Sequence, residues 1–294
     1  MSLAESQRGK AIILLILLSL IWGTSFILMK RGLTVYSAGE VGSIRVVAAA
    51  IFLLPFAIFR LKELTGNQFA KLFASGLMGI FFPAFLFATA QTRLESSVSG
   101  ILNSLTPICT LIVGVALYKQ PFRSQSLFGV IIGLIGTVVL IFANYGGAVG
   151  GLNLFAFLVI IACVFYAMNL NFVKFKITEL KALTITSVSI LLISPLALIY
   201  LLGFTDFTTK VTSHPQALPA LGYIVLLGAM STSVATILFN LLVKISNPLF
   251  TSSVTYIIPI VAVGWGLLDG EQLLLGHFIG MAAIIGGVYL ANKK

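Results

Sequence analysis

The chain carries very little charge. Only 9% of its 294 residues are charged, whereas soluble domains carry about 25%. So few charged side chains do not cover the surface of a soluble globule, which excludes that class. Hydrophobic residues make up 59% of the chain, and their surplus surface is expected to face lipid. Helices satisfy their own backbone groups in lipid, so we predict an all-α integral membrane protein.

Reactive side chains are also scarce. The chain has 8 acidic residues, 2 histidines and 2 cysteines, and none of the carboxylates or histidines is expected at the centre of a membrane span. This scarcity argues against a buried proton or sodium relay. Cys109 and Cys163 lie in apolar runs and are predicted to pack rather than to form a disulfide. No metalloprotease, P-loop or serine–histidine pattern occurs, so we predict no enzyme activity, cofactor or metal site.

Basic residues are in excess, with a net charge of +10. In a soluble chain this excess would suggest nucleic-acid binding. In a membrane protein the simpler explanation is that Lys and Arg accumulate in cytoplasmic loops. We therefore predict a lipid bilayer and a small-molecule substrate as partners, and no nucleic acid.

Apolar runs of membrane length recur along the chain. A bilayer core requires roughly 20 apolar residues per helix. The first run follows Arg8 and Lys10, as in a signal peptide, but it is too long and lacks a small-residue cleavage site. Ten spans are predicted, at residues 11–29, 41–59, 72–91, 96–118, 125–143, 152–173, 182–203, 217–243, 249–268 and 273–291.

The basic residues alternate between the predicted loops. Thirteen of them fall on the side of the two termini, and four on the other side. This bias predicts that both termini are cytoplasmic. Arg123, Lys293 and Lys294 are among the thirteen.

Two segments with a central proline resemble each other. Ser99–Leu117 and Thr251–Asp269 align with an offset of 152 positions, which pairs Pro107 with Pro259. Duplication predicts two repeats, residues 1–146 and 147–294, which together form one transport domain. Each repeat holds five predicted spans, an odd number, so the second must enter the membrane from the opposite side. We therefore predict two inverted five-helix repeats.

The residues beside the two prolines are candidate substrate contacts. Proline removes a backbone hydrogen bond and bends a helix, so Pro107 and Pro259 are candidate hinges. Asn103 and Ser104 precede the first proline by about one turn, and Thr255 and Tyr256 precede the second. These polar groups either satisfy the freed carbonyls or line a cavity and contact a substrate.

Further candidates lie near the middle of other spans. Trp22 and Tyr166 align between the repeats and either pack between helices or stack on a substrate. Asn169 and Asn240 are amides in apolar stretches that need hydrogen-bond partners. Arg45 lies about one turn inside the second span and is expected to snorkel outward or to pair with Glu40.

Glycine pairs four positions apart occur in the fifth and tenth spans. They are Gly129 with Gly133 and Gly276 with Gly280. Such small faces let helices approach closely, either within the chain or in a dimer. The oligomeric state is therefore a monomer or a homodimer.

The combined pattern resembles a known family. The run W-G-x-x-F-x-x-x-K from Trp22 to Lys30, Arg45, the two prolines and the acidic Glu271 are similar to the EamA-type transporters of the drug/metabolite transporter superfamily, most of all the bacterial aromatic amino acid exporters. The resemblance implies a ten-helix basket whose cavity is lined by helices 1, 3, 4, 6, 8 and 9. Gln120 stands where a second acidic residue would follow helix 4.

The predicted function is transport across a bacterial inner membrane. We expect alternating access that exports amino acids, aromatic ones among them, and related neutral or zwitterionic metabolites. With no cationic residue expected at mid-membrane, a phosphorylated or sugar-nucleotide substrate is disfavoured. A nucleotide-sugar or lipid-linked carrier on the same fold, and a channel, stay open as alternatives.

Overall fold

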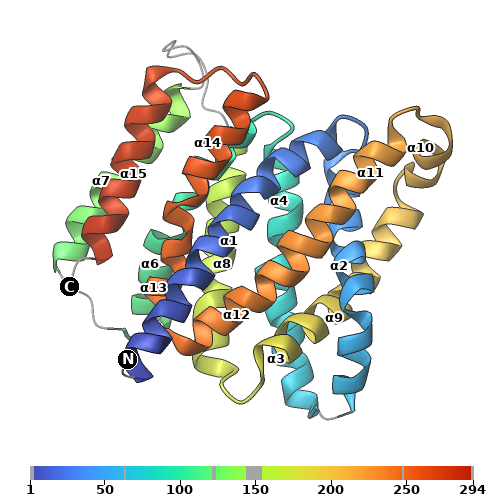
Figure 1. Ribbon diagram of the computed structural model, residues 1–294, viewed down its shortest axis with the longest axis horizontal. Coiled ribbons are helices and arrows are strands. Elements are labelled where there is room, and N and C mark those ends of the chain that lie inside the picture. Colours follow the sequence, from blue (N-terminus) through green and yellow to red (C-terminus); the bar gives the residue numbers. More distant parts are fainter. Residues whose placement is uncertain (1–2, 63, 121–123, 144–153, 247, 293–294) are drawn as a thin grey trace.

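The computed structural model describes residues 3–62, 64–120, 124–143, 154–246 and 248–292, and within them every regular element is a helix (Figure 1). This confirms the all-α prediction. The boundary predicted at residues 146 and 147 lies outside these residues, as do Arg123, Lys293 and Lys294. The elements before that boundary are α1 Leu3–Leu33, α2 Ala38–Leu61, α3 Gly66–Gly76, η1 Leu77–Phe81, α4 Phe82–Ala90, α5 Ser96–Leu102, η2 Asn103–Leu105, α6 Thr106–Tyr118 and α7 Ser124–Ala143.

The rest of the chain follows a similar order. A short helix, α10, lies in the connection that follows α9. The elements are α8 Leu154–Lys176, α9 Ala182–Gly203, α10 Phe207–Ser213, α11 Ala217–Leu226, η3 Leu227–Val234, α12 Ala235–Ile245, α13 Pro248–Ser252, η4 Ser253–Tyr256, α14 Ile258–Leu268 and α15 Leu275–Asn292.

Eight helical stretches in the described part of the chain are long and apolar enough to cross a membrane. Large apolar side chains on their outer faces are exposed, Ile51 and Phe59 of α2 among them, as expected for contact with lipid. The protein is therefore a multi-pass membrane protein. The stretches are Gly9–Leu33, Ala38–Leu61, Gly66–Ala90, Ser96–Tyr118, Leu154–Lys176, Ala182–Gly203, Ala217–Ile245 and Phe250–Leu268.

The two other predicted spans correspond to α7 and α15, which lie side by side at one edge of the molecule (Figure 1). Glycines allow the close approach. A Cβ atom on Gly287 would lie 2.5 Å from the Gly133 backbone nitrogen, and one on Gly136 would lie 2.9 Å from the Gly280 carbonyl oxygen. The glycine faces of the fifth and tenth spans therefore pack against each other within one chain.

Four of the long helical stretches change hydrogen-bonding pattern midway. The 3-10 turns η2 and η4 lie immediately before the helices in which Pro107 and Pro259 occupy the first turn. Proline lacks the N–H that an uninterrupted α-helix needs, which explains both breaks. The π-helical turns η1 and η3 interrupt two other stretches, and nothing in the sequence pattern predicted them. Such turns are often found at functional sites.

Candidate functional site: a cavity between the two halves of the chain

A cavity lies among helices from both halves of the chain. Its empty volume is about 770 Å³, including its open mouth, which suits a small organic molecule. The lining residues come from α1, α2, α4 and α6, from the turns η1 and η2, and from α8, α12 and the segment around η4. Chain segments far apart in sequence thus build one site.

Aromatic rings form much of the wall. Trp22 of α1 and Phe239 of α12 lie with ring centroids 5.0 Å apart. Phe87 of α4 contacts two further rings, with centroids 5.7 Å from Phe26 and 6.0 Å from Tyr166. These contacts hold the rings in place, and all five line the cavity.

Amide and hydroxyl groups interrupt this wall. Asn169 accepts a hydrogen bond from the Ser75 hydroxyl at 2.7 Å, which orients its side chain. The Thr106 hydroxyl donates to the Asn103 carbonyl at 2.7 Å, and the Thr255 hydroxyl donates to the Ser252 carbonyl at 2.9 Å. A few placed polar groups in an apolar wall are typical of small-molecule sites.

Five of the eight predicted contact residues line the cavity: Trp22, Asn103, Tyr166, Asn169 and Thr255.

The other three lie elsewhere, so the prediction that they contact the substrate is not supported by their position. The Ser104 hydroxyl donates to the Thr255 carbonyl at 3.0 Å, joining η2 to η4. Asn240 faces α9, where its amide donates to the Thr186 hydroxyl at 2.8 Å. Tyr256 packs against the hydrophobic core. None of the three is among the cavity-lining residues, and spacing along the chain alone did not reveal this.

Arg45 corrects a second expectation. It neither snorkels outward nor pairs with Glu40. It is 8% exposed, lines the cavity, and donates from Nε to the Thr232 hydroxyl at 2.6 Å. Glu40 and Arg45 are five positions apart on α2, so their side chains leave the helix about 140° apart. Glu40 instead accepts from the Lys210 Nζ at 2.6 Å.

The π-helical turn η3 anchors two cavity residues. Its Ser231 carbonyl accepts from Trp22 Nε1 at 3.0 Å, and its Thr232 hydroxyl accepts from Arg45. A π-helical turn shifts the helical register, which lets successive residues of one turn serve neighbouring helices. The polar run Ser231–Thr232–Ser233 in an apolar span was the sequence signal that could have indicated this role.

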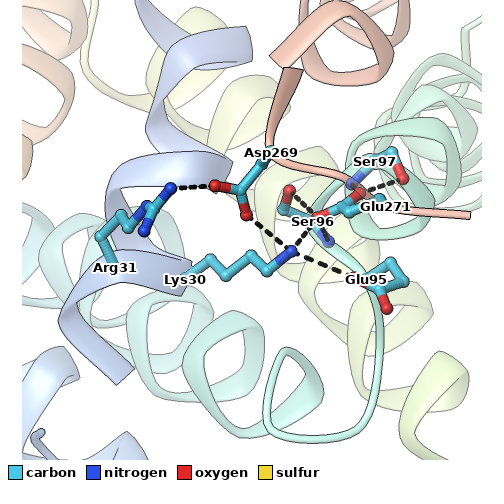
Figure 2. Close-up of polar contacts among 7 residues, drawn as sticks. All are labelled: Lys30, Arg31, Glu95, Ser96, Ser97, Asp269 and Glu271. Carbon is cyan, nitrogen blue, oxygen red and sulfur yellow. Dashed lines mark hydrogen bonds and ion pairs between the residues drawn. The ribbon is translucent and has the colours of Figure 1, made fainter. Parts of the chain in front are cut away.

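An ion-pair network lies next to the cavity-lining residue Met29, where α1 ends (Figure 2). Lys30 follows the cavity residue Met29, and its Nζ lies 2.8 Å from Glu271, 2.9 Å from Asp269 and 3.3 Å from Glu95. Arg31 also pairs with Asp269. The network joins the end of α1 to the connection between α14 and α15 and to the start of α5.

Glu271 is the most highly coordinated residue in this network. Its two carboxylate oxygens accept from the backbone N–H and hydroxyl of Ser96, at 3.0 and 2.5 Å, and of Ser97, at 3.1 and 2.5 Å. Burial opposes ionisation, but the hydrogen bonds from Lys30, Ser96 and Ser97 outweigh it and lower the pKa of Glu271 to about 2. The carboxylate is therefore charged at any physiological pH.

Lys174, one turn after the cavity-lining residue Leu170, meets neutral acceptors. Lys174 of α8 donates to the carbonyls of Val243 and Ser246, at 2.9 and 2.5 Å, where α12 ends. Unsatisfied carbonyls at a helix C-terminus attract a cation. The Gln120 amide donates to Asn171 Oδ1 at 2.9 Å.

The chain is similar in sequence to one family of membrane proteins. A sequence profile of the EamA-like transporter family matches residues 9–142 and, separately, residues 153–293. The chain belongs to this family. The fold is also similar to that of a solved crystal structure, which is 17% identical in sequence and has a TM-score of 0.69. The match covers 97% of this chain and 96% of the other, and the likeness concerns the fold alone.

Relatives cover nearly the full length of this EamA-like chain. An uncharacterized transporter of Archaeoglobus fulgidus is 26% identical over 93% of this chain and 95% of its own. The uncharacterized inner membrane transporter YedA of Escherichia coli is 24% identical over 94% of this chain and 88% of its own. The family and these names indicate a membrane transporter rather than an enzyme.

Proposed function

We propose that this EamA-like protein is a secondary transporter that exports amino acids, aromatic ones among them, and related small neutral or zwitterionic metabolites by alternating access. The observation that carries the proposal is the cavity, built from both halves of the chain and lined by rings, amides and hydroxyls. Aromatic faces suit a planar side chain, and the amides suit the polar backbone of an amino acid.

The transport mechanism requires two similar halves, and we propose ten membrane helices arranged as two inverted repeats, residues 1–146 and 147–294. Several pairs of features support this. The π-helical turns begin at Leu77 and Leu227, 150 positions apart. The positive backbone φ angles of Lys119 and Gly270, 52° and 81°, occur 151 positions apart.

Pro107 and Pro259 are proposed as the hinges of this mechanism. Each follows a 3-10 turn where the regular helical hydrogen bonds are already interrupted. Bending at such points needs few further bonds to break, so one repeat can rock against the other.

We place the protein in the inner membrane of a bacterium with both termini in the cytoplasm. Lys and Arg distribution supports this orientation. The start of α1 and the end of α15 lie at the same end of the molecule (Figure 1), as an even number of crossings requires. The ion-pair network around Lys30 then faces the outside. The proposed assembly is a monomer or a homodimer.

Substrate counterflow in proteoliposomes tests the function. We expect saturable exchange of radiolabelled amino acids above that of empty vesicles. Asn169→Ala should raise the KM for transport, because Asn169 lines the cavity. Asn240→Ala is the matched control: it also removes a buried amide, but one that bonds to Thr186 outside the cavity. Absence of saturable exchange for every amino acid would refute the proposal.

The rival functions give different readouts. A channel would show ion conductance in a planar bilayer. A nucleotide-sugar or lipid-linked carrier would show inhibition of counterflow by those ligands. Exchange that persists after pH and sodium gradients collapse would indicate facilitated transport without ion coupling.

A further inference from the structure

Arg45 places a permanent positive charge in the cavity wall. Its side chain is more than nine-tenths buried, and its Nε–H donates a hydrogen bond to the Thr232 hydroxyl. It also interacts electrostatically with the Tyr166 hydroxyl. A guanidinium has five N–H donors, so these neutral partners leave donors for another group.

No carboxylate balances this charge among the residues that the structure describes around the cavity. The acidic side chains with identified partners are engaged elsewhere: Glu40 with Lys210, and Glu95, Asp269 and Glu271 with Lys30. A buried charge without a counter-ion is costly to hold in a membrane. An anionic ligand would neutralise it in place.

We propose that Arg45 binds the carboxylate of the transported substrate, and that the cavity favours small organic monocarboxylates with an apolar or aromatic body. This inference rests on the proposed transport function but changes its substrate class, from amino acids to carboxylates that lack the ammonium group. A guanidinium and a carboxylate form two parallel charge-assisted hydrogen bonds. A single fixed positive charge matches one negative charge, whereas a nucleotide sugar would bring at least two.

The surroundings of Arg45 indicate the body of the substrate. Trp22 and Arg45 are anchored on the successive residues Ser231 and Thr232, so an aromatic face lies in the same part of the cavity as the guanidinium. A ring joined to a carboxylate by a short linker can contact both groups.

The same arrangement disfavours a second charge on the ligand. An amino acid would bring an ammonium group into a wall that offers it only amide and hydroxyl oxygens and ring faces. The ammonium would lose its water without gaining a carboxylate partner. A carboxylate that lacks the ammonium should therefore bind at least as tightly as its amino acid counterpart.

Four probes that share a phenyl ring test the inference by titration calorimetry on purified protein. They are phenylpropionate, phenylalanine, phenethylamine and phenylpropanol. We expect phenylpropionate to bind at least as tightly as phenylalanine, and phenethylamine to bind most weakly. Arg45→Gln should weaken phenylpropionate binding about tenfold or more and leave phenylpropanol binding nearly unchanged.

Lys176→Gln is the control, because it removes the same charge from an exposed position on α8. Should Arg45→Gln fail to fold, Arg45→Lys keeps the charge but not the fork geometry, and should give an intermediate loss for phenylpropionate only. Equal binding of phenylpropionate and phenethylamine by the unmodified protein, or equal losses for phenylpropionate and phenylpropanol in the variant, would overturn the inference. Binding without transport would leave it standing and remove the proposed function instead.

Discussion

Glu271 and Gln120 occupy similar turns, each after a helix that has a proline in its first turn. Each follows a residue with positive φ and donates its backbone N–H to a glycine carbonyl, Glu271 to Gly266 at 2.9 Å and Gln120 to Gly114 at 3.1 Å. Glu271 meets Lys30, whereas Gln120 meets the neutral Asn171. One of the two similar turns therefore carries an ionic contact and the other a neutral one.

Replacing Glu271 by Gln should weaken the ion-pair network around Lys30. The substitution removes the charge that Lys30, Ser96 and Ser97 stabilise, and breaking such a buried pair costs about 3 kcal/mol. We expect a lower Tm in detergent at neutral pH, measured by scanning fluorimetry.

The pH dependence of this effect has a definite sign. The folded-state pKa of Glu271, about 2, lies below its ordinary value of 4.5. Its stabilisation is therefore fully present above about 4.5 and is lost as the pH falls towards 2. The Tm difference between the unmodified protein and Glu271→Gln should shrink in that window, and a difference that stays constant down to pH 2 would contradict the assignment.

Gln120→Glu should disturb the hydrogen bond between Gln120 and Asn171, and its effect should also diminish at acid pH. Asn171 directs its oxygen at Gln120, because its nitrogen already donates to the carbonyls of Thr110 and Ala167. An introduced carboxylate accepts but does not donate, so we expect a lower Tm at neutral pH. Protonation restores a donor, so the loss should diminish below about pH 4.3.

Gln120→Met provides the control for that variant. It removes the hydrogen bond without adding charge, and its Tm loss should not vary with pH. A Tm for Gln120→Glu above that of the unmodified protein would show that Lys174 has moved to pair with the new carboxylate.

Gly287→Ala should loosen the packing of α7 against α15. A Cβ atom there would lie 2.5 Å from the Gly133 backbone nitrogen and 2.6 Å from the Gly129 carbonyl oxygen, and backbone atoms do not move aside easily. Overpacking of this kind costs about 1–3 kcal/mol. The neighbouring Gly286 has no atom within 4 Å of its Cβ position, so Gly286→Ala should leave the Tm unchanged or raise it. Equal effects of the two substitutions would contradict the close approach.

Trp22 should report ligand binding. The chain has 2 tryptophans, and only Trp22 is among the cavity-lining residues described. Trp265 instead donates to the Thr24 hydroxyl and is 41% exposed. We expect phenylpropionate to change the fluorescence of Trp265→Phe but not of Trp22→Phe. The reverse pattern would place the ligand outside the cavity.

Much of the architecture was readable from the chain. Every predicted span coincides with helical structure in the described residues, because hydrophobic runs in lipid must satisfy their own backbone groups. The breaks at Pro107 and Pro259 were also predictable, since proline lacks a backbone N–H.

The predicted substrate contacts stay predictions, although five of the eight residues line the cavity. Trp22, Asn103, Tyr166, Asn169 and Thr255 are long or polar side chains near mid-span, and helix rotation turned these five inward. The same rule also selected Ser104, Asn240 and Tyr256, which rotation turned towards other helices. The position of a residue along a helix sets its depth in the membrane. Its position around the helix axis decides which neighbouring groups its side chain contacts.

Composition and hydrophobic pattern thus determined that the chain is a helical membrane protein, since this property depends on local sequence and on lipid as solvent. Tertiary structure alone decided that Arg45 faces the cavity, that η3 supports Arg45 and Trp22, and that Glu271 pairs with Lys30 whereas Gln120 pairs with Asn171. Those relationships depend on helix rotation and on two π-helical turns, and both are decided by packing between segments far apart in the chain.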